Sequence, residues 1–216
     1  MENFNNLWLK KVAANIAKHG EFKIMSEVIK HSTPLDQTRE LMRLLKLNLS
    51  DEEIHNILTE SACFYPRDDL QPFTQLYNET KDLKLVHQKL QEKFEKDIVN
   101  YKSLSDDELQ YIKDHNWGVA GLLDGNTIIA TKIPAEFHEY FKSHDSKDKQ
   151  SLYCHCPRIK ESIKNGEAIP YEYCYCGGGY YRDIWKTITQ SKVKIEIMQS
   201  ILKGDEVCQF KIYIDE

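Results

Sequence analysis

The sequence predicts an α+β fold, in which an N-terminal helical region is followed by an antiparallel or mixed sheet packed with helices. Three observations lead to this prediction. Apolar residues keep helical spacing through the first hundred positions. Two short apolar runs flank Asp124-Gly125, as in a β-hairpin. Alternating apolar residues return at 193–214. We therefore expect a helical region over 1–103 and an α+β domain over 104–216.

In the first region, one helix face is marked by apolar residues at every fourth position: Phe4, Trp8, Val12 and Ile16. Thr33, followed by proline, is typical of a helix N-cap. Ser50 and Ser105 each precede a glutamate by three residues, which predicts two capping boxes. A long helix is expected over about 72–101, where apolar residues keep helical spacing.

In the second region, the pattern changes at Trp117, and "GLLDGNTIIAT" predicts the first hairpin. Short helices are expected over about 134–141 and 157–165, with "SHDSKDKQ" between them as a polar loop. The stretches "SLYCHC" and "YEYCYC" are expected to be extended, and a helix should follow Gly177–Gly179. "KVKIEIMQSI" and "VCQFKIYI" predict a closing hairpin.

Composition narrows the possible partners and compartments. Of the 216 residues, 41% are hydrophobic and 29% are charged, which is ordinary for a globular chain. The net charge of −5 and the lack of a long basic run do not favour nucleic acid as a partner. No apolar run approaches the roughly 20 residues of a membrane helix, and the N-terminus lacks the apolar core of a secretory signal. We expect a cytoplasmic protein, where clustered thiols serve as metal ligands or reactive groups.

The chemistry of this chain centres on a doubled motif, "YCHCPR" and "YCYCGG", which holds four of the six cysteines: Cys154, Cys156, Cys174 and Cys176. Residues i and i+2 of an extended segment point to the same side, so the two thiols of each pair should converge. Four thiolates around one centre suit a tetrahedral zinc ion. The sequence therefore predicts that these four cysteines lie together and bind zinc.

Two other interpretations stay open. One or two of the thiolates serve as a nucleophile or a redox pair, or all four are packed as small apolar side chains. Cys156 and Cys176 each precede an expected helix, whose N-terminus favours a thiolate. Arg158 and Arg182 add positive charge, and Tyr180 belongs to a dense tyrosine cluster. We expect these last three residues to contact a ligand.

The remaining cysteines have simpler interpretations. Cys208 shares the apolar face of the last strand, so we expect a buried core residue. Cys63 follows a capped helix, and we expect it to serve in packing. The run Gly177–Gly179 resembles a phosphate-binding turn only superficially, because no Walker or dinucleotide pattern surrounds it.

The stretch from about Trp117 to Ile214 resembles a bacterial family of largely uncharacterised proteins. The resemblance rests on "CHCPR", "CYCGGGYYRDIW", "VKIEIMQSIL" and "GDEVCQFKI". The last of these is also similar to the 4-vinyl-reductase-type ligand-binding domain and to proteins named L-2-amino-thiazoline-4-carboxylate hydrolases. The resemblance implies a sheet packed with helices around a small-molecule pocket, and cysteine-based binding at the two pairs. Cys63 departs from the pattern, since it lacks a second nearby cysteine.

Two functions from different classes follow. The first is a zinc- and small-molecule-binding protein with a four-cysteine site. The alternative is a thiol- or metal-dependent hydrolase of a small C–N or C–S substrate. Catalytic zinc keeps an open coordination position, whereas structural zinc is closed by four protein ligands, so the number of ligands discriminates between them.

Overall fold

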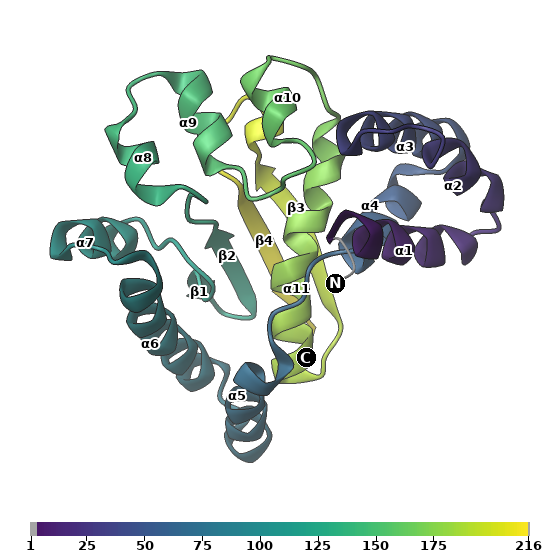
Figure 1. The fold of residues 1–216 in the computed structure, drawn as a ribbon. Coiled ribbons are helices and arrows are strands. Elements are labelled where there is room, and N and C mark those ends of the chain that lie inside the picture. The colour runs from purple at the N-terminus through teal and green to yellow at the C-terminus, as the bar shows by residue number, and fades with distance from the viewer. Residues whose placement is uncertain (1–3, 216) are drawn as a thin grey trace. The chain divides into compact units, whose positions relative to one another are not determined.

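Helices and one four-stranded antiparallel sheet make up the structure, a computed structural model that describes residues 4–215 (Figure 1). The predicted α+β fold is confirmed. The elements, in chain order, are α1 (Phe4–Ala17), α2 (Phe22–Val28), α3 (Pro34–Asn48), α4 (Asp51–Glu60), α5 (Arg67–Thr80), α6 (Leu83–Lys102), α7 (Asp106–Asp114), β1 (Leu122–Asp124), β2 (Thr127–Thr131), α8 (Phe137–Lys142), α9 (Ser146–Tyr153), α10 (Lys160–Lys164), the 3-10 helix η1 (Tyr171–Cys174), α11 (Tyr175–Thr189), β3 (Val193–Gln199), the 3-10 helix η2 (Ile201–Lys203) and β4 (Gln209–Ile214).

The chain divides into two compact units, and neither is continuous in sequence. The first unit comprises the chain up to Cys63, Pro134–Gly179 and Ser200–Glu206. The second comprises Phe64–Ile133, Tyr180–Gln199 and the chain from Val207 onward. All four strands follow residue 104, in the region expected to carry the sheet. The predicted domain boundary between residues 103 and 104 stays a prediction.

The first unit begins with α1 to α4, which are built as the sequence predicts. Trp8, Val12 and Ile16 are buried along one face of α1. Thr33 caps α3 by accepting a hydrogen bond from the backbone N–H of Asp36 at 3.0 Å. The capping box at Ser50 is present at the start of α4. These caps satisfy backbone donors that a helix start otherwise leaves without partners.

The prediction of a polar loop at Ser143–Gln150 is wrong, because α9 begins inside it. Asp145 is the N-cap of α9, and its carboxylate accepts hydrogen bonds from the backbone N–H groups of Lys147 and Asp148 at 2.9 Å. The segment carries few apolar residues, so periodicity alone does not reveal the helix. The helices expected on either side of it are present as α8 and α10.

The second unit contains the sheet, with strand order β1-β2-β4-β3. Asp124 pairs with Thr127 in the first hairpin, and Gly125 takes the left-handed conformation (φ 57°) that its turn requires. Val193 pairs with Ile214 in the closing hairpin. Both hairpins are as predicted. One sheet face packs against α11, where the rings of Tyr181 and Phe210 lie 5.5 Å apart.

The single long helix predicted over 72–101 is instead two helices, α5 and α6. Lys81 takes a left-handed conformation (φ 51°) and ends α5. Asp82 then caps α6, since its carboxylate accepts a hydrogen bond from the N–H of Leu85 at 2.9 Å. The helical spacing of apolar residues continues across the break between α5 and α6. The spacing alone therefore indicates one helix. The capping box predicted at Ser105 is confirmed at the start of α7.

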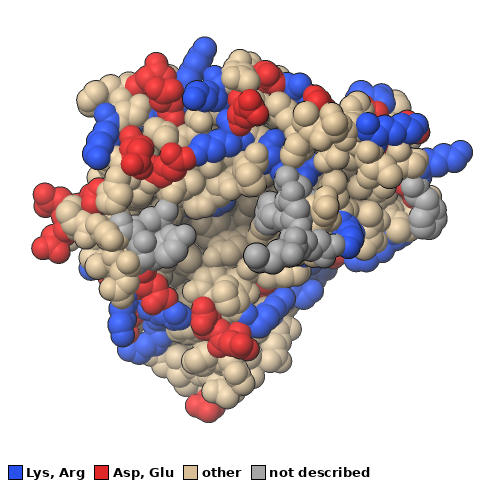
Figure 2. Space-filling view, in the orientation of Figure 1, with Lys and Arg blue, Asp and Glu red and all other residues tan. Residues whose placement is uncertain are grey.

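Figure 2 shows acidic and basic side chains interspersed over the face that it draws. In the part of the chain that the structure describes, no helix is long and apolar enough to cross a membrane.

Candidate functional site

The first cysteine pair lies between two helices of the first unit. Cys154 is the C-cap of α9, and its N–H donates to the carbonyl oxygen of Gln150 at 3.3 Å. The carbonyl oxygen of Cys156 accepts from the N–H groups of Ile159 and Lys160 at 3.3 and 3.1 Å. Cys156 therefore stands at the start of the turn that leads into α10. The prediction that "SLYCHC" is extended is wrong for its first half, because α9 continues to Tyr153.

The second pair is helical, against the prediction of an extended segment. Cys174 is the last residue of η1, and Cys176 lies in the first turn of α11. The run Gly177–Gly179 belongs to α11 and does not form a turn before it. A Cβ atom on Gly179 would collide with the carbonyl oxygen of Thr59 and lie 2.7 Å from the Cβ of Ala62. The absence of a side chain thus lets α11 approach the end of α4 closely, which explains this glycine without any phosphate.

The sulfurs of Cys156, Cys174 and Cys176 make hydrogen bonds that the sequence did not indicate. The Sγ of Cys156 lies 3.2 Å from the hydroxyl of Tyr173. The Sγ of Cys176 accepts from the indole N–H of Trp8 at 3.4 Å. The Sγ of Cys174 accepts from the hydroxyl of Ser200 at 3.2 Å. The second cysteine of each pair therefore meets an aromatic side chain, whereas Cys174 is directed to a different partner.

Arg158 holds a fixed positive charge beside these groups. Its side chain is 2% exposed, and its guanidinium lies 4.7 Å above the ring of Trp8. The Nε group donates to the hydroxyl of Thr38 at 3.1 Å, and Nη2 donates to the Pro34 carbonyl and to Gln37 Oε1, each at 3.2 Å. The start of α3 therefore positions the guanidinium. We call Trp8, Cys156, Arg158, Tyr173 and Cys176 the thiol cluster.

The charges in the thiol cluster are coupled. Burial lowers the pKa of Arg158, while attraction to Tyr173, Cys156 and Cys176 raises it. Burial raises the pKa of Tyr173 well above its usual range, and the neighbouring cysteine sulfurs raise it further. The phenol thus stays protonated near neutral pH.

The four sulfurs, as they lie, do not form a tetrahedral metal centre. Within residues 4–215, no group of three or more His, Cys, Asp or Glu side chains is arranged to hold a metal ion. Cys154 is buried, and Cys174 contacts Ser200. The structure brings Cys156 and Cys176 to two neighbouring aromatic side chains. Zinc binding by all four cysteines stays a prediction.

Ligand contacts by Tyr180 and Arg182 stay a prediction. Tyr180 and Arg182 belong to the second unit, where the ring of Tyr180 lies 6.0 Å from that of Tyr65. Cys208 is buried in the second unit, as expected. Cys63 is exposed, so the packing role expected for it is wrong. It ends the segment after α4, where its side chain reaches solvent.

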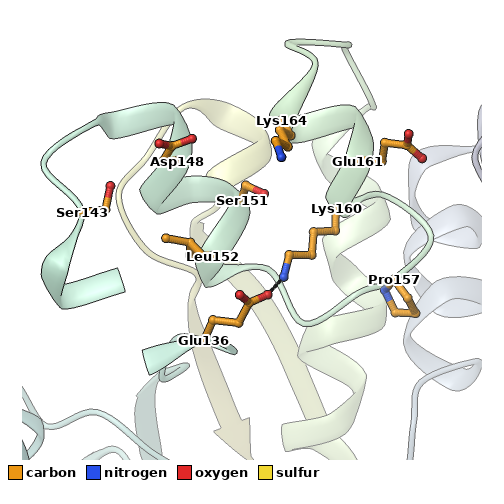
Figure 3. A pocket seen from close by; sticks show the side chains of 9 residues that line it. All are labelled: Glu136, Ser143, Asp148, Ser151, Leu152, Pro157, Lys160, Glu161 and Lys164. Atoms are coloured by element: carbon orange, nitrogen blue, oxygen red, sulfur yellow. Dashed lines mark ion pairs between the residues drawn. The ribbon is translucent and has the colours of Figure 1, made fainter. Parts of the chain in front are cut away.

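An open pocket lies beside the first cysteine pair (Figure 3). Its volume is about 760 Å³. An ion pair between Glu136 and Lys160 crosses the view in Figure 3, and Pro157, the neighbour of Cys156, forms part of the wall. The other lining residues are Ser143, Asp148, Ser151, Leu152, Glu161 and Lys164. This mixed lining suits a polar molecule better than an apolar one.

Sequence reasoning missed two members of the thiol cluster. Trp8 was assigned to the core face of its helix, and it is indeed 3% exposed. Its place beside Cys176 has no local signal, because 168 residues separate the two. In the sequence, Tyr173 is one of several clustered tyrosines. The repeated Tyr-Cys-x-Cys motif contains it, yet nothing in the motif distinguishes Tyr173 from Tyr153.

Comparison with known proteins gives one match. Residues 130–216 match the model of a family of unknown function, DUF6144. The matched stretch includes both cysteine pairs and the closing hairpin. No curated protein and no solved structure matches the chain.

Proposed function

We propose that this protein binds a small molecule at the thiol cluster, with the sulfurs of Cys156 and Cys176 as contact groups. One observation carries the proposal: thiols from two separate segments contact two neighbouring aromatic side chains, Cys156 at the hydroxyl of Tyr173 and Cys176 at the indole of Trp8, and the buried guanidinium of Arg158 lies 4.7 Å above the Trp8 ring. Burial of a cation is costly unless opposite charge compensates it. Arg158 is buried beside Trp8, and a thiolate is the form of cysteine that binds metals and electrophiles.

Zinc is the metal that the four-cysteine set implies, and we include it in the proposal. The residues that would hold it are Cys154, Cys156, Cys174 and Cys176, and four thiolates are a common donor set for zinc. The bond between Cys174 and Ser200 has to open before Cys174 can contribute. A ligand held by Cys156 and Cys176 requires no such change, so this pair is the core of the proposed site.

The test compares protein purified under reducing conditions with two variants. Native mass spectrometry and metal analysis measure what co-purifies, and Cd²⁺ titration reports thiolate ligation through its ultraviolet charge-transfer band. We expect the wild type to bind Cd²⁺ and the C156S/C176S variant to lose that binding. C63S is the matched control, because Cys63 is exposed and outside the cluster. Equal binding by the wild type and C156S/C176S would contradict the proposal.

Hydrolysis is the second candidate, and one contact favours it. The hydroxyl of Tyr173 lies 3.2 Å from the sulfur of Cys156 and stays protonated, so it pairs a sulfur nucleophile with a proton donor. In this proposal the sulfur of Cys156 attacks the carbon of a C–N or C–S bond, and Tyr173 protonates the nitrogen or sulfur that leaves. Water then attacks the carbon bonded to Cys156, which releases the cysteine and returns a proton to Tyr173. The choice of ligand class rests on the resemblance that we infer from the sequence of the closing hairpin to L-2-amino-thiazoline-4-carboxylate hydrolases and to the 4-vinyl-reductase-type domain.

Turnover of L-2-amino-thiazoline-4-carboxylate tests this candidate directly. We expect product release by the wild type and a loss of at least about a hundredfold in C156S, since a serine hydroxyl is a much weaker nucleophile here. Y173F should lose less, because it keeps the nucleophile. Cd²⁺ binding together with no turnover would leave the binding function and exclude this hydrolase.

A further inference from the structure

We propose that Cys156 and Cys176 form a redox-active dithiol, which is oxidised to an intramolecular disulfide by exchange with small disulfides such as oxidised glutathione. This activity goes beyond ligand binding, because it requires no ligand in the site. The structural basis is that the sulfur of Cys156 lies 3.2 Å from the hydroxyl of Tyr173 and the sulfur of Cys176 lies 3.4 Å from the indole nitrogen of Trp8, and that the rings of Tyr173 and Trp8 lie 5.7 Å apart.

The local geometry places the two sulfurs on one side of the second segment. Tyr173 and Cys176 are three residues apart across the continuous turn from η1 into α11, so their side chains lie on the same side. The hydroxyl of Tyr173 then reaches the sulfur of Cys156 at 3.2 Å. Cys156 and Cys176 therefore approach each other around the phenol.

Other disulfides among the four motif cysteines are less favourable. A disulfide within either Cys-x-Cys pair spans one residue only, which strains the geometry that the bond needs. Cys154 is buried at the end of α9, and the sulfur of Cys174 is bonded by Ser200. Cys156 and Cys176 are both partly exposed, so a small disulfide can reach them.

The thiol–disulfide exchange with oxidised glutathione takes place in two steps. The thiolate of one cysteine attacks a sulfur of oxidised glutathione, which forms a mixed disulfide and releases one glutathione thiolate. The second cysteine sulfur then attacks the protein sulfur of the mixed disulfide and releases the other glutathione. Two electrons pass from the cysteine pair to glutathione, and the two thiol protons end on the two reduced glutathione molecules.

The indole N–H of Trp8 sets the direction in which this equilibrium lies. Its partial positive charge meets the sulfur of Cys176 at 3.4 Å, and a thiol sulfur accepts a hydrogen bond better than a disulfide sulfur does, so the environment favours the reduced pair. Stabilisation of the reduced form makes a disulfide more oxidising. We therefore expect a disulfide that small thiols reduce readily, in contrast to a structural disulfide.

The experiment equilibrates reduced protein over a series of glutathione ratios, quenches it in acid, alkylates it and analyses tryptic peptides. Trypsin places Cys156 in residues 150–158 and Cys176 in residues 165–182. We expect these two peptides to be joined in the wild type and in C154S/C174S, and to stay separate in C156S/C176S. Chymotrypsin also cleaves between Cys174 and Cys176, after Tyr175, and identifies the bonded cysteine of the second pair without a substitution.

Removal of the indole N–H tests the charge argument. In W8F the sulfur of Cys176 loses a hydrogen-bond donor, so the equilibrium constant with glutathione should move toward the disulfide by about tenfold. Two results would overturn the proposal. One is a wild type that stays fully reduced at every glutathione ratio, and the other is a link between the two peptides that persists in C156S/C176S.

Discussion

The indole N–H of Trp8 donates to the sulfur of Cys176 at 3.4 Å, across 168 residues of sequence. The same ring lies 5.7 Å from the ring of Tyr173 and carries the guanidinium of Arg158 above it. The first helix of the chain thus contributes directly to a site whose sulfurs come from a distant cysteine motif. Five testable predictions follow from this arrangement and from the packing around it.

The four motif cysteines should differ in reactivity. Cys156 and Cys176 are partly exposed and adjacent to Arg158, whereas Cys154 is buried and Cys174 is bonded by Ser200. In metal-free protein near neutral pH, we expect iodoacetamide to modify Cys156 and Cys176 several-fold faster than Cys154 and Cys174. Time-resolved peptide mass spectrometry measures the rates, with exposed Cys63 as an internal reference. Equal slow labelling of all four would favour simple packing.

Charge at position 158 should control that reactivity. Arg158→Met removes the cation and keeps an apolar side chain, so alkylation of Cys156 and Cys176 should slow by about tenfold. Arg158→Lys keeps the charge but loses the three-way hydrogen bonding to α3, and it should retain most of the rate. Both variants should lose stability, by about 3 kcal/mol, which denaturant unfolding measures. Equal rates in the two variants would show that charge is not the cause.

Gly179→Ala should destabilise the protein by about 2–4 kcal/mol, because the added Cβ collides with the backbone of α4 and overpacking has this order of cost. Gly20→Ala is the matched control. Gly20 has a left-handed conformation (φ 80°) and open space around it, so only backbone strain of about 1 kcal/mol is expected there. Urea denaturation separates the two effects. A smaller loss at Gly179 than at Gly20 would argue against the close approach of α11 to α4.

Cys208→Ala should cost about 1 kcal/mol of folding free energy, since it removes one small buried group. The substitution should leave Cd²⁺ binding and the alkylation rates of Cys156 and Cys176 unchanged. Thermal unfolding and the Cd²⁺ titration measure the two outcomes. Loss of Cd²⁺ binding in this variant would show that Cys208 contributes to the binding site and is not only a core residue.

Stability should fall as the pH drops below about 7. Burial lowers the pKa of His55, although Asp51 and Glu172 act in the opposite direction, and the ring stacks on Tyr175 at 3.8 Å. The unfolded chain therefore takes up a proton at a higher pH than the folded chain does. The resulting loss of stability starts near the unfolded value of about 6.5 and levels off below the lowered folded pKa.

His55→Gln should reduce that pH dependence, which unfolding free energies measured between pH 8 and pH 5 will show. Burial also lowers the pKa of His87, so some dependence should remain in the variant and decrease further in H55Q/H87Q. A pH profile identical to that of the wild type in H55Q would contradict the assignment of His55.

Helix caps and hairpins could be predicted from the sequence, because they depend on interactions between residues that are close together in the chain. Helix caps at Thr33, Ser50 and Ser105 depend on neighbouring backbone donors, and hairpins depend on turn residues such as Gly125 and on alternation along the strand. Those predictions are confirmed. The doubled cysteine motif likewise identified the sulfurs, because its unusual composition is visible without coordinates.

The side-chain partner of each sulfur depends on the tertiary structure. Extended and helical backbones both accommodate Cys-x-Cys, and the second pair became helical where Gly179 packs closely against α4. Side-chain partners from remote segments then separated the pairs: Trp8 and Tyr173 reach the second cysteines, while Ser200 holds Cys174. Such contacts depend on how helices pack over long sequence distances, and no local pattern of residues encodes that packing.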